Sequence, residues 1–284
     1  MKKRVFALLL SVLLLLCGCA KTQKPQAPVL VTTTEQLLQM TKSLLTGTEL
    51  EKTAVLKSVV SEPVSCVHDY TLSVNQMKLL ESADAVIEVG LGFEDFMGSA
   101  LSSVQGRQII ASDKITPLTG DEGPDPHIWL SPVNCKQMVQ NIANALCECY
   151  PDSASRIALN AERYCDEMDS LLEYGKNELK DLSCRSLVTF HDGFSYFAEA
   201  FDLTIAAAME IEAGSEPSAK ELEAVIETVQ NEKIPAVFAE KNGTTDAAEL
   251  VAAQTGTKVA VLDMGLSGGD AITYNIDTVK EVLQ

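Results

Sequence analysis

A stretch of thirty residues without proline, from Ser153 to Leu182, constrains the fold more than any other part of the chain. Apolar or small residues recur in it every three or four positions, which is the period of one face of an α-helix. Thirty helical residues would extend about 45 Å, because each residue adds about 1.5 Å. One small domain does not need a helix of that length, so we expect it to connect two lobes. A long coiled coil is the alternative, and Gly175 within the apolar seam argues against it.

On both sides of this helix, strand-like and helix-like segments alternate, which is typical of α/β folds with largely parallel sheets. We predict strands at 29–33, 53–60, 85–89, 107–111, 186–190, 204–208, 236–239 and 258–262. We predict helices at 35–45, 73–82, 94–104, 132–150, 193–200, 218–231 and 245–255, with a last helix from Ile276 and a loop over 114–126. The chain of 284 residues is long enough for two cores. We therefore expect an N-terminal lobe at 28–150, the linking helix at 151–183 and a C-terminal lobe at 184–284.

The first residues carry the pattern of an export signal. Three basic residues precede the apolar run 5–16, which is too short to span a bilayer that needs about 20 residues. The next residues, Leu16-Cys17-Gly18-Cys19, resemble a bacterial lipobox. We predict a signal peptide over 1–18, a lipid on Cys19 and a short tether over 19–27, with an ordinary cleaved signal peptide as the alternative. The protein should lie outside the cytoplasm, anchored to the bacterial cell membrane.

The charge of the chain limits its partners. It has 22 basic and 40 acidic residues and a formal net charge of −18, so a nucleic acid is not an expected partner. A cation would be attracted. Six cysteines follow Cys19, and export leaves two readings of them open, small buried residues or a disulfide framework. They are Cys66, Cys135, Cys147, Cys149, Cys165 and Cys184.

The chain has only three histidines, His68, His127 and His191. Each falls in a predicted loop that follows a strand or precedes a helix, at the edge where α/β sheets bind ligands. Each also has an aspartate one or two residues away, which could accept a hydrogen bond from the second ring nitrogen and orient the imidazole toward a metal. Three neutral imidazoles suit zinc, which takes four ligands in proteins. The three aspartates are Asp69, Asp125 and Asp192.

A fourth ligand could be water or a carboxylate from the second lobe. Glu240 and Asp263 both come directly after predicted strands, and either could instead orient a ligand without touching the metal. We favour Asp263, because a glycine-rich loop follows it and could let it approach the ion. Asp270 is a weaker candidate.

Several segments together resemble the solute-binding proteins of zinc and manganese ABC transporters, over essentially the whole mature chain. DPHIWLSP, at 125–132, is the most specific of them. The others are His68-Asp69-Tyr70, LLESADAVIEVGLGFE at 79–94, FHDGFSYFAEAF at 190–201, IEAGSEPSAKELEAVIE at 211–227 and FAEKNGTTDAAELVAAQTG at 238–256.

The resemblance implies two α/β lobes joined by a rigid helix, with one metal ion in the cleft between them. His68, His127 and His191 fall on the family's first three ligands, and Asp263 falls near the fourth. A histidine at the third position resembles the zinc-type members, so we expect Zn²⁺ as cargo, with Mn²⁺ as the alternative. The resemblance further implies delivery to an ABC permease without any catalysis, and we expect a monomer. The chain departs from the family in having no histidine-rich loop before His127 and in placing Cys66 close to His68.

Two other classes of function remain as alternatives. Three histidines and a bound water would also build a zinc hydrolase, but the chain has no HExxH, GxSxG or Walker pattern. A surface adhesin would need no histidines in this arrangement.

Overall fold

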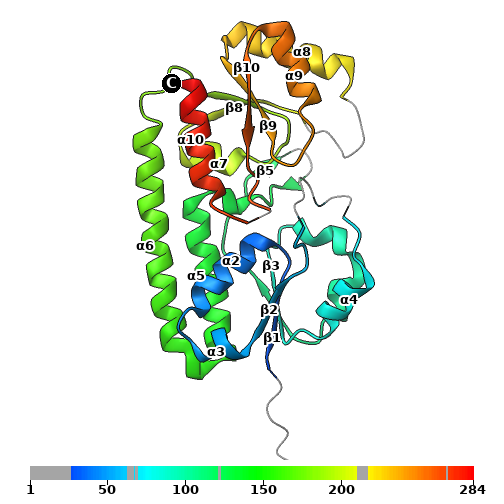
Figure 1. The fold of residues 1–284 in the computed structure, drawn as a ribbon, viewed down its shortest axis with the longest axis vertical. Coiled ribbons are helices and arrows are strands. Elements are labelled where there is room, and N and C mark those ends of the chain that lie inside the picture. Colours follow the sequence, from blue (N-terminus) through cyan, green and yellow to red (C-terminus); the bar gives the residue numbers. More distant parts are fainter. Residues whose placement is uncertain (1–26, 63–66, 68–69, 121–122, 210–216, 267) are drawn as a thin grey trace, which may run out of the picture.

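The computed structural model describes residues 27–62, 67, 70–120, 123–209, 217–266 and 268–284. Figure 1 shows two α/β lobes, one above the other, with a long helix running along one side of both. The predicted fold class is confirmed, since both lobes are built on parallel sheets. The predicted signal peptide, Cys19, Cys66 and His68 lie outside the described residues.

The N-terminal lobe contains a four-stranded parallel sheet in the order β2-β1-β3-β4. The central strands are rich in buried valine, leucine and isoleucine, as expected where helices cover both faces of a parallel sheet. Its strands are β1 (Val29–Thr32), β2 (Val55–Ser58), β3 (Ala85–Glu88) and β4 (Arg107–Ile110). Its helices are α2 (Glu35–Leu45), α3 (Glu49–Thr53), α4 (Val74–Glu81) and the 3₁₀ segment η1 (Phe93–Ser103).

The C-terminal lobe repeats this design with the strand order β10-β9-β7-β8. Figure 1 shows that the carboxyl ends of the strands in each sheet face the other lobe, so the loops that follow the strands meet between the lobes. The strands are β7 (Ser186–Thr189), β8 (Thr204–Ala208), β9 (Ala236–Glu240) and β10 (Lys258–Leu262). The helices are α7 (Ser195–Ala200), α8 (Ala219–Glu232), α9 (Asp246–Thr255) and α10 (Ala271–Leu283).

The segment between the sheets contains the long helix. It begins with a small hairpin and a 3₁₀ turn and continues through two packed helices, α5 and α6. These elements are β5 (Thr119–Gly120), β6 (Gly123–Pro124), η2 (Ile128–Leu130), α5 (Pro132–Cys149), η3 (Pro151–Ser153) and α6 (Ala154–Glu178). The 25 residues of α6 extend about 37 Å, and α6 ends four residues before Leu182, where the proline-free stretch ends.

Helix α6 is fixed to both lobes. Near its start, Nδ2 of Asn160 donates to the carbonyl oxygens of Leu44 and Thr46 at the end of α2, both at 2.8 Å. Near its end, a Cβ on Gly175 would lie 2.3 Å from Phe201 and 2.8 Å from Ile276. Glycine therefore allows the close approach of α6 to the C-terminal lobe, and the helix connects the lobes as the sequence predicted.

Four local predictions were wrong. The predicted loop over 114–126 contains the two short paired strands β5 and β6. The five-residue helix α3 was missed, because it buries only Leu50 and shows no apolar period. The predicted helix at 94–104 is 3₁₀ in character and is kinked at Gly98, whose φ is 52°. The last helix begins at Ala271, five residues earlier than predicted, because the carboxylate of Asp270 caps it by accepting from the backbone N–H of Thr273 at 3.1 Å.

The five described cysteines are free thiols, so they form no disulfide framework among themselves. The alternative prediction, that the cysteines are small buried residues, is correct only for Cys135. Cys149 is exposed, and the remaining three are half-buried. Burial, followed by the charge of Asp270, raises the pKa of the Cys135 thiol to about 12. Within the described residues, no helix combines the length and the apolarity that crossing a bilayer requires.

Candidate metal centre

His191 lies in the loop between β7 and α7, at the edge of the C-terminal sheet that faces the other lobe. Its side chain is buried, with 5% of the residue exposed. Because β9 is the neighbour of β7 in the sheet, Glu240 at the end of β9 lies beside the ring. Its Oε2 is 3.6 Å from Nδ1 of His191, which is within ion-pair range and long for a hydrogen bond.

Glu240 is a buried carboxyl group with few polar partners to offset the loss of hydration. Its Oε1 has no hydrogen-bond partner in the described part of the chain. Burial, and then the charge of Asp263, raises the pKa of Glu240 to about 8. A carboxyl group in this position can accept a hydrogen bond from Nδ1 of His191 and so leave Nε2 available as a metal ligand.

His127 lies in the segment that leads from the N-terminal sheet to the long helix. It directly precedes η2 and is also buried. Its carboxylate partner is the one predicted, Asp125. Oδ1 of Asp125 accepts from the backbone N–H of His127 at 2.9 Å and lies 2.8 Å from Nδ1 of the ring. The short loop thus fixes both the backbone and the ring, and it directs Nε2 away from Asp125.

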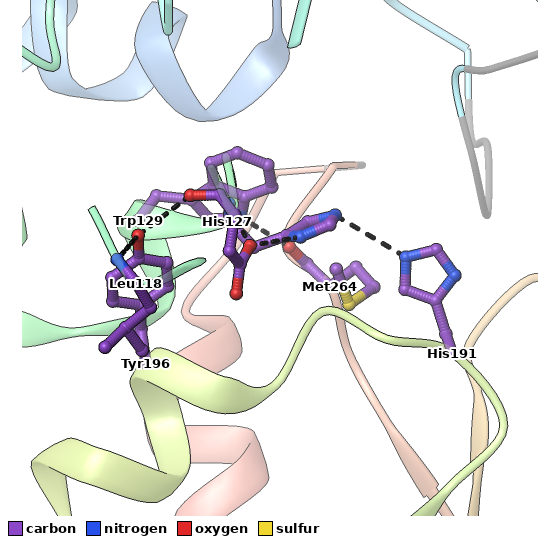
Figure 2. A network of polar contacts seen from close by, with 7 residues as sticks. Leu118, His127, Trp129, His191, Tyr196 and Met264 are labelled. Atoms are coloured by element: carbon purple, nitrogen blue, oxygen red, sulfur yellow. Dashed lines mark hydrogen bonds and ion pairs between the residues drawn. The ribbon is translucent and has the colours of Figure 1, made fainter. Parts of the chain in front are cut away.

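The two described histidines approach each other through their Nε2 atoms. Nε2 of His127 and Nε2 of His191 are 3.5 Å apart, and the rings are nearly perpendicular at 86°. Figure 2 shows the two imidazoles directed toward each other from opposite sides. Two imidazole nitrogens bound to one tetrahedral zinc ion would be about 3.3 Å apart, given Zn–N distances of about 2.05 Å. The observed separation therefore fits two ligands of one ion.

The third predicted ligand, His68, lies outside the described residues, as does Cys66. Over the described ranges, no group of three or more histidine, cysteine, aspartate or glutamate residues is gathered closely enough to hold a metal. The structure thus brings together two of the four predicted ligands.

Asp263 follows β10 and is 5% exposed, but it is already engaged. Its Oδ2 is 2.7 Å from Nζ of Lys241, and its Oδ1 accepts from the backbone N–H of Gly265 at 2.8 Å. Asn275 of α10 holds the Asp263 backbone by accepting from its N–H at 2.7 Å and donating to its carbonyl at 2.9 Å. Asp270 caps α10 instead, through both carboxylate oxygens.

Two side chains bridge the lobes beside His127 (Figure 2). Nε1 of Trp129 donates to the carbonyl of Met264 at 2.7 Å. The Tyr196 hydroxyl donates to the carbonyl of Asp125 at 2.8 Å and accepts from the backbone N–H of Leu118 at 2.9 Å. Burial is the main reason that the pKa of Tyr196 is raised to about 12, so the hydroxyl stays protonated and can donate.

Tyr196 and Met264 were not predicted as site residues. Neither belongs to a pattern of metal ligands, and their contacts to the 118–129 segment join residues far apart in the chain. Trp129 carried a signal, since it is the only tryptophan and lies two residues after His127. Its ring also packs edge-on against His127, with centroids 5.4 Å apart.

Comparison with known proteins identifies the family of the chain. The family described as "Zinc-uptake complex component A periplasmic" matches residues 30–282. The zinc-binding protein TroA of Treponema pallidum (strain Nichols) is 26% identical over 90% of this chain and 89% of its own. The zinc-binding protein AdcA of Streptococcus pyogenes serotype M6 is 26% identical over 92% of this chain, which spans only 56% of AdcA.

Among solved structures, the crystal structure of ZnuA superimposes with a TM-score of 0.78 at 28% identity, covering 90% of this chain and 97% of that one. The family match takes in both sheets, the long helix, His127, His191 and Asp263. The chain therefore belongs to the family of the periplasmic component A of zinc-uptake complexes.

Proposed function

We propose that this protein captures Zn²⁺ outside the cytoplasm, between its two lobes, and delivers it to an ABC permease for uptake. The observation that carries the proposal is the 3.5 Å separation of the two Nε2 atoms of His127 and His191. Each ring has a carboxyl group on its Nδ1 side, Asp125 at 2.8 Å and Glu240 at 3.6 Å, which leaves Nε2 to the ion. Neutral imidazole nitrogen suits zinc better than the hard ion Mn²⁺, which remains the alternative cargo.

His68 supplies the third nitrogen in this proposal. The fourth ligand is Asp263, which exchanges the ammonium group of Lys241 for the metal ion. Both partners carry a positive charge, so the buried carboxylate remains compensated before and after loading. Glu240 and a water molecule are the alternatives for this position. Asp270 is less suited, because its carboxylate caps α10.

We further propose that residues 1–18 are removed as a signal peptide and that a lipid on Cys19 anchors the protein to the membrane. The tether would then place the lobes near the permease. The protein would act as a monomer and catalyse no reaction. A zinc hydrolase would need a water ligand and a general base beside the ion, and a surface adhesin would need no inward-facing imidazoles.

Native mass spectrometry of residues 20–284, purified without added metal, tests the proposal. Zinc is titrated in competition with a chelator, and Mn²⁺ is titrated in parallel. We expect one tightly bound zinc ion per chain, which is lost in the triple variant His68→Ala, His127→Ala, His191→Ala. Cys149→Ser is the matched control, because it removes the exposed thiol and should retain the zinc.

A wild-type protein without stoichiometric metal would refute the proposal. Zinc that persists in the triple variant would place the site elsewhere. Turnover of a hydrolysable ester or phosphate by the zinc-loaded protein, abolished in the same variant, would favour the hydrolase instead.

A further inference from the structure

Gly193 lies beside the candidate metal centre, and the space that a side chain would need there is occupied by Met264, His191 and His127. A Cβ on Gly193 would lie 2.5 Å from Cε of Met264, 2.9 Å from Cδ2 of His191 and 3.2 Å from Cδ2 of His127. Gly193 is not among the residues with positive φ, so the backbone does not require glycine here. The reason for glycine is therefore steric, because any side chain would displace the Met264 methyl group and both imidazoles.

Met264 is consequently the apolar neighbour of both rings. Figure 2 shows its side chain beneath the His127 imidazole, on the side from which His191 approaches. Met264 is 2% exposed, and it directly follows Asp263 in the chain. Its position is fixed by the bond from Nε1 of Trp129 to its carbonyl and by the bond from Gly265 N–H to Oδ1 of Asp263.

A buried thioether at this place affects which ions the centre can hold. Mn²⁺ prefers octahedral coordination by oxygen, which in protein sites includes water. Zn²⁺ is satisfied by four ligands and has no geometric preference from its d electrons. A methyl group and a sulfur atom against the two imidazoles occupy volume that additional water ligands would need, and they offer no oxygen in exchange.

We propose that Met264, seated in the space left by Gly193, is a specificity-determining residue that excludes water from the ion and so discriminates against Mn²⁺. The inference rests on the proposed function, because it concerns the ion held by the same histidines. It extends that function by assigning metal selection to a residue that need not ligate the metal.

The test compares two variants of residues 20–284. Met264→Gln has a similar length but brings an amide oxygen and admits water, whereas Met264→Leu keeps an apolar group of similar volume. Zinc affinity is measured by competition with a chromogenic chelator, and Mn²⁺ affinity by electron paramagnetic resonance of the free ion. Met264→Gln should lower the ratio of zinc to manganese affinity by about 10- to 100-fold, the range found for residues around metal ligands. Met264→Leu should leave the ratio close to that of the wild type.

A second readout does not depend on affinity. The visible absorption of bound Co²⁺ reports its coordination number, and it should be of the intense four-coordinate type in the wild type and in Met264→Leu. In Met264→Gln the spectrum should shift to the weak type of a five- or six-coordinate ion. A purely structural role of Met264 would lower stability without this spectral change.

The possible failures are distinguishable. If the wild type binds no zinc in a one-to-one ratio, the proposed function fails and this inference fails with it. If zinc binds through the histidines but Met264→Gln leaves both the affinity ratio and the Co²⁺ spectrum unchanged, only this inference is overturned. If Met264→Leu loses selectivity as Met264→Gln does, the sulfur itself discriminates and water exclusion is refuted.

Discussion

Replacing Glu88 with glutamine should raise the free energy of unfolding by about 1 to 2 kcal/mol near pH 8 and by much less near pH 4. Glu88 ends β3 in the N-terminal lobe and is 7% exposed. Its Oε1 has no hydrogen-bond partner in the described residues. Burial, and then the charge of Glu94, raises the pKa of Glu88 from 4.5 to about 7.

The neighbouring carboxylate is much better satisfied. Glu94 accepts hydrogen bonds from Oγ1 of Thr33 at 2.7 Å, from the N–H of Val89 at 2.7 Å and from the N–H of Gly90 at 2.9 Å. Burial raises the pKa of Glu94 as well, and these three hydrogen bonds oppose that shift by stabilising its ionised form. Glu88 has no such donor on Oε1 in the described residues, so its ionised form is the less compensated of the two.

The sign of the pH dependence follows from these pKa values. Between about pH 4.5 and pH 7 the unfolded chain has lost the Glu88 proton and the folded chain retains it, so wild-type stability falls as the pH rises through this window. Above pH 7 both states are ionised, and the destabilisation is complete. A shift from 4.5 to about 7 corresponds to at most about 3 kcal/mol at 1.36 kcal/mol per pH unit. The glutamine amide remains a buried polar group, which reduces the expected gain to about 1 to 2 kcal/mol.

Urea unfolding at both pH values, followed by the fluorescence of the single tryptophan, measures the effect. Glu81→Gln is the matched control, because Glu81 ends α4 at an exposed position and its replacement should change stability by less than about 0.5 kcal/mol. Equal stabilisation by Glu88→Gln at both pH values would refute the electrostatic reasoning. So would the absence of any gain near pH 8.

Two further predictions concern the contacts around the candidate centre. Trp129→Phe should lower the free energy of unfolding by about 2 to 3 kcal/mol, because it leaves the buried carbonyl of Met264 without a donor and removes part of the ring that packs on His127. Urea unfolding followed by circular dichroism measures this change. A loss below about 0.5 kcal/mol would contradict the prediction. Lys241→Met should lower the stability of the metal-free protein by about 1 kcal/mol, because Asp263 loses its cation. It should also increase the rise in melting temperature on adding Zn²⁺, measured by calorimetry, and an unchanged rise would argue that Asp263 is not a ligand.

The sequence predicted most of the secondary structure because its signals are local. The apolar period and the absence of proline identified α6, and Ser73 and Ser218 begin helices α4 and α8 with side-chain caps that a sequence can reveal. Helix α3 was not predicted, because five residues are too few to show a helical period of apolar residues. The start of α10 was predicted wrongly, because Asp270 was interpreted as a candidate metal ligand and not as the residue that caps the helix.

The candidate site was predictable to a smaller extent. His127 and its partner Asp125 are two residues apart, so their contact could be inferred from the sequence alone. For His191 the sequence indicated Asp192 as the carboxylate partner, whereas the structure also brings Glu240, which is far away in the chain, to 3.6 Å from Nδ1. It lies beside His191 only because β9 is next to β7 in the sheet.

The alternation of strands and helices, the long connecting helix and the positions of His127 and His191 in loops could all be predicted from the sequence, since each depends on neighbouring residues and their spacing. Three contacts follow from the packing of the lobes and not from any local pattern: His127 and His191 approach to 3.5 Å, Lys241 pairs with Asp263, and Met264 fills the space at Gly193. These contacts join residues 22 to 71 positions apart. They form because two parallel sheets direct the carboxyl ends of their strands at one another across the lobes, an arrangement that depends on strand order and packing and leaves no local periodic signal.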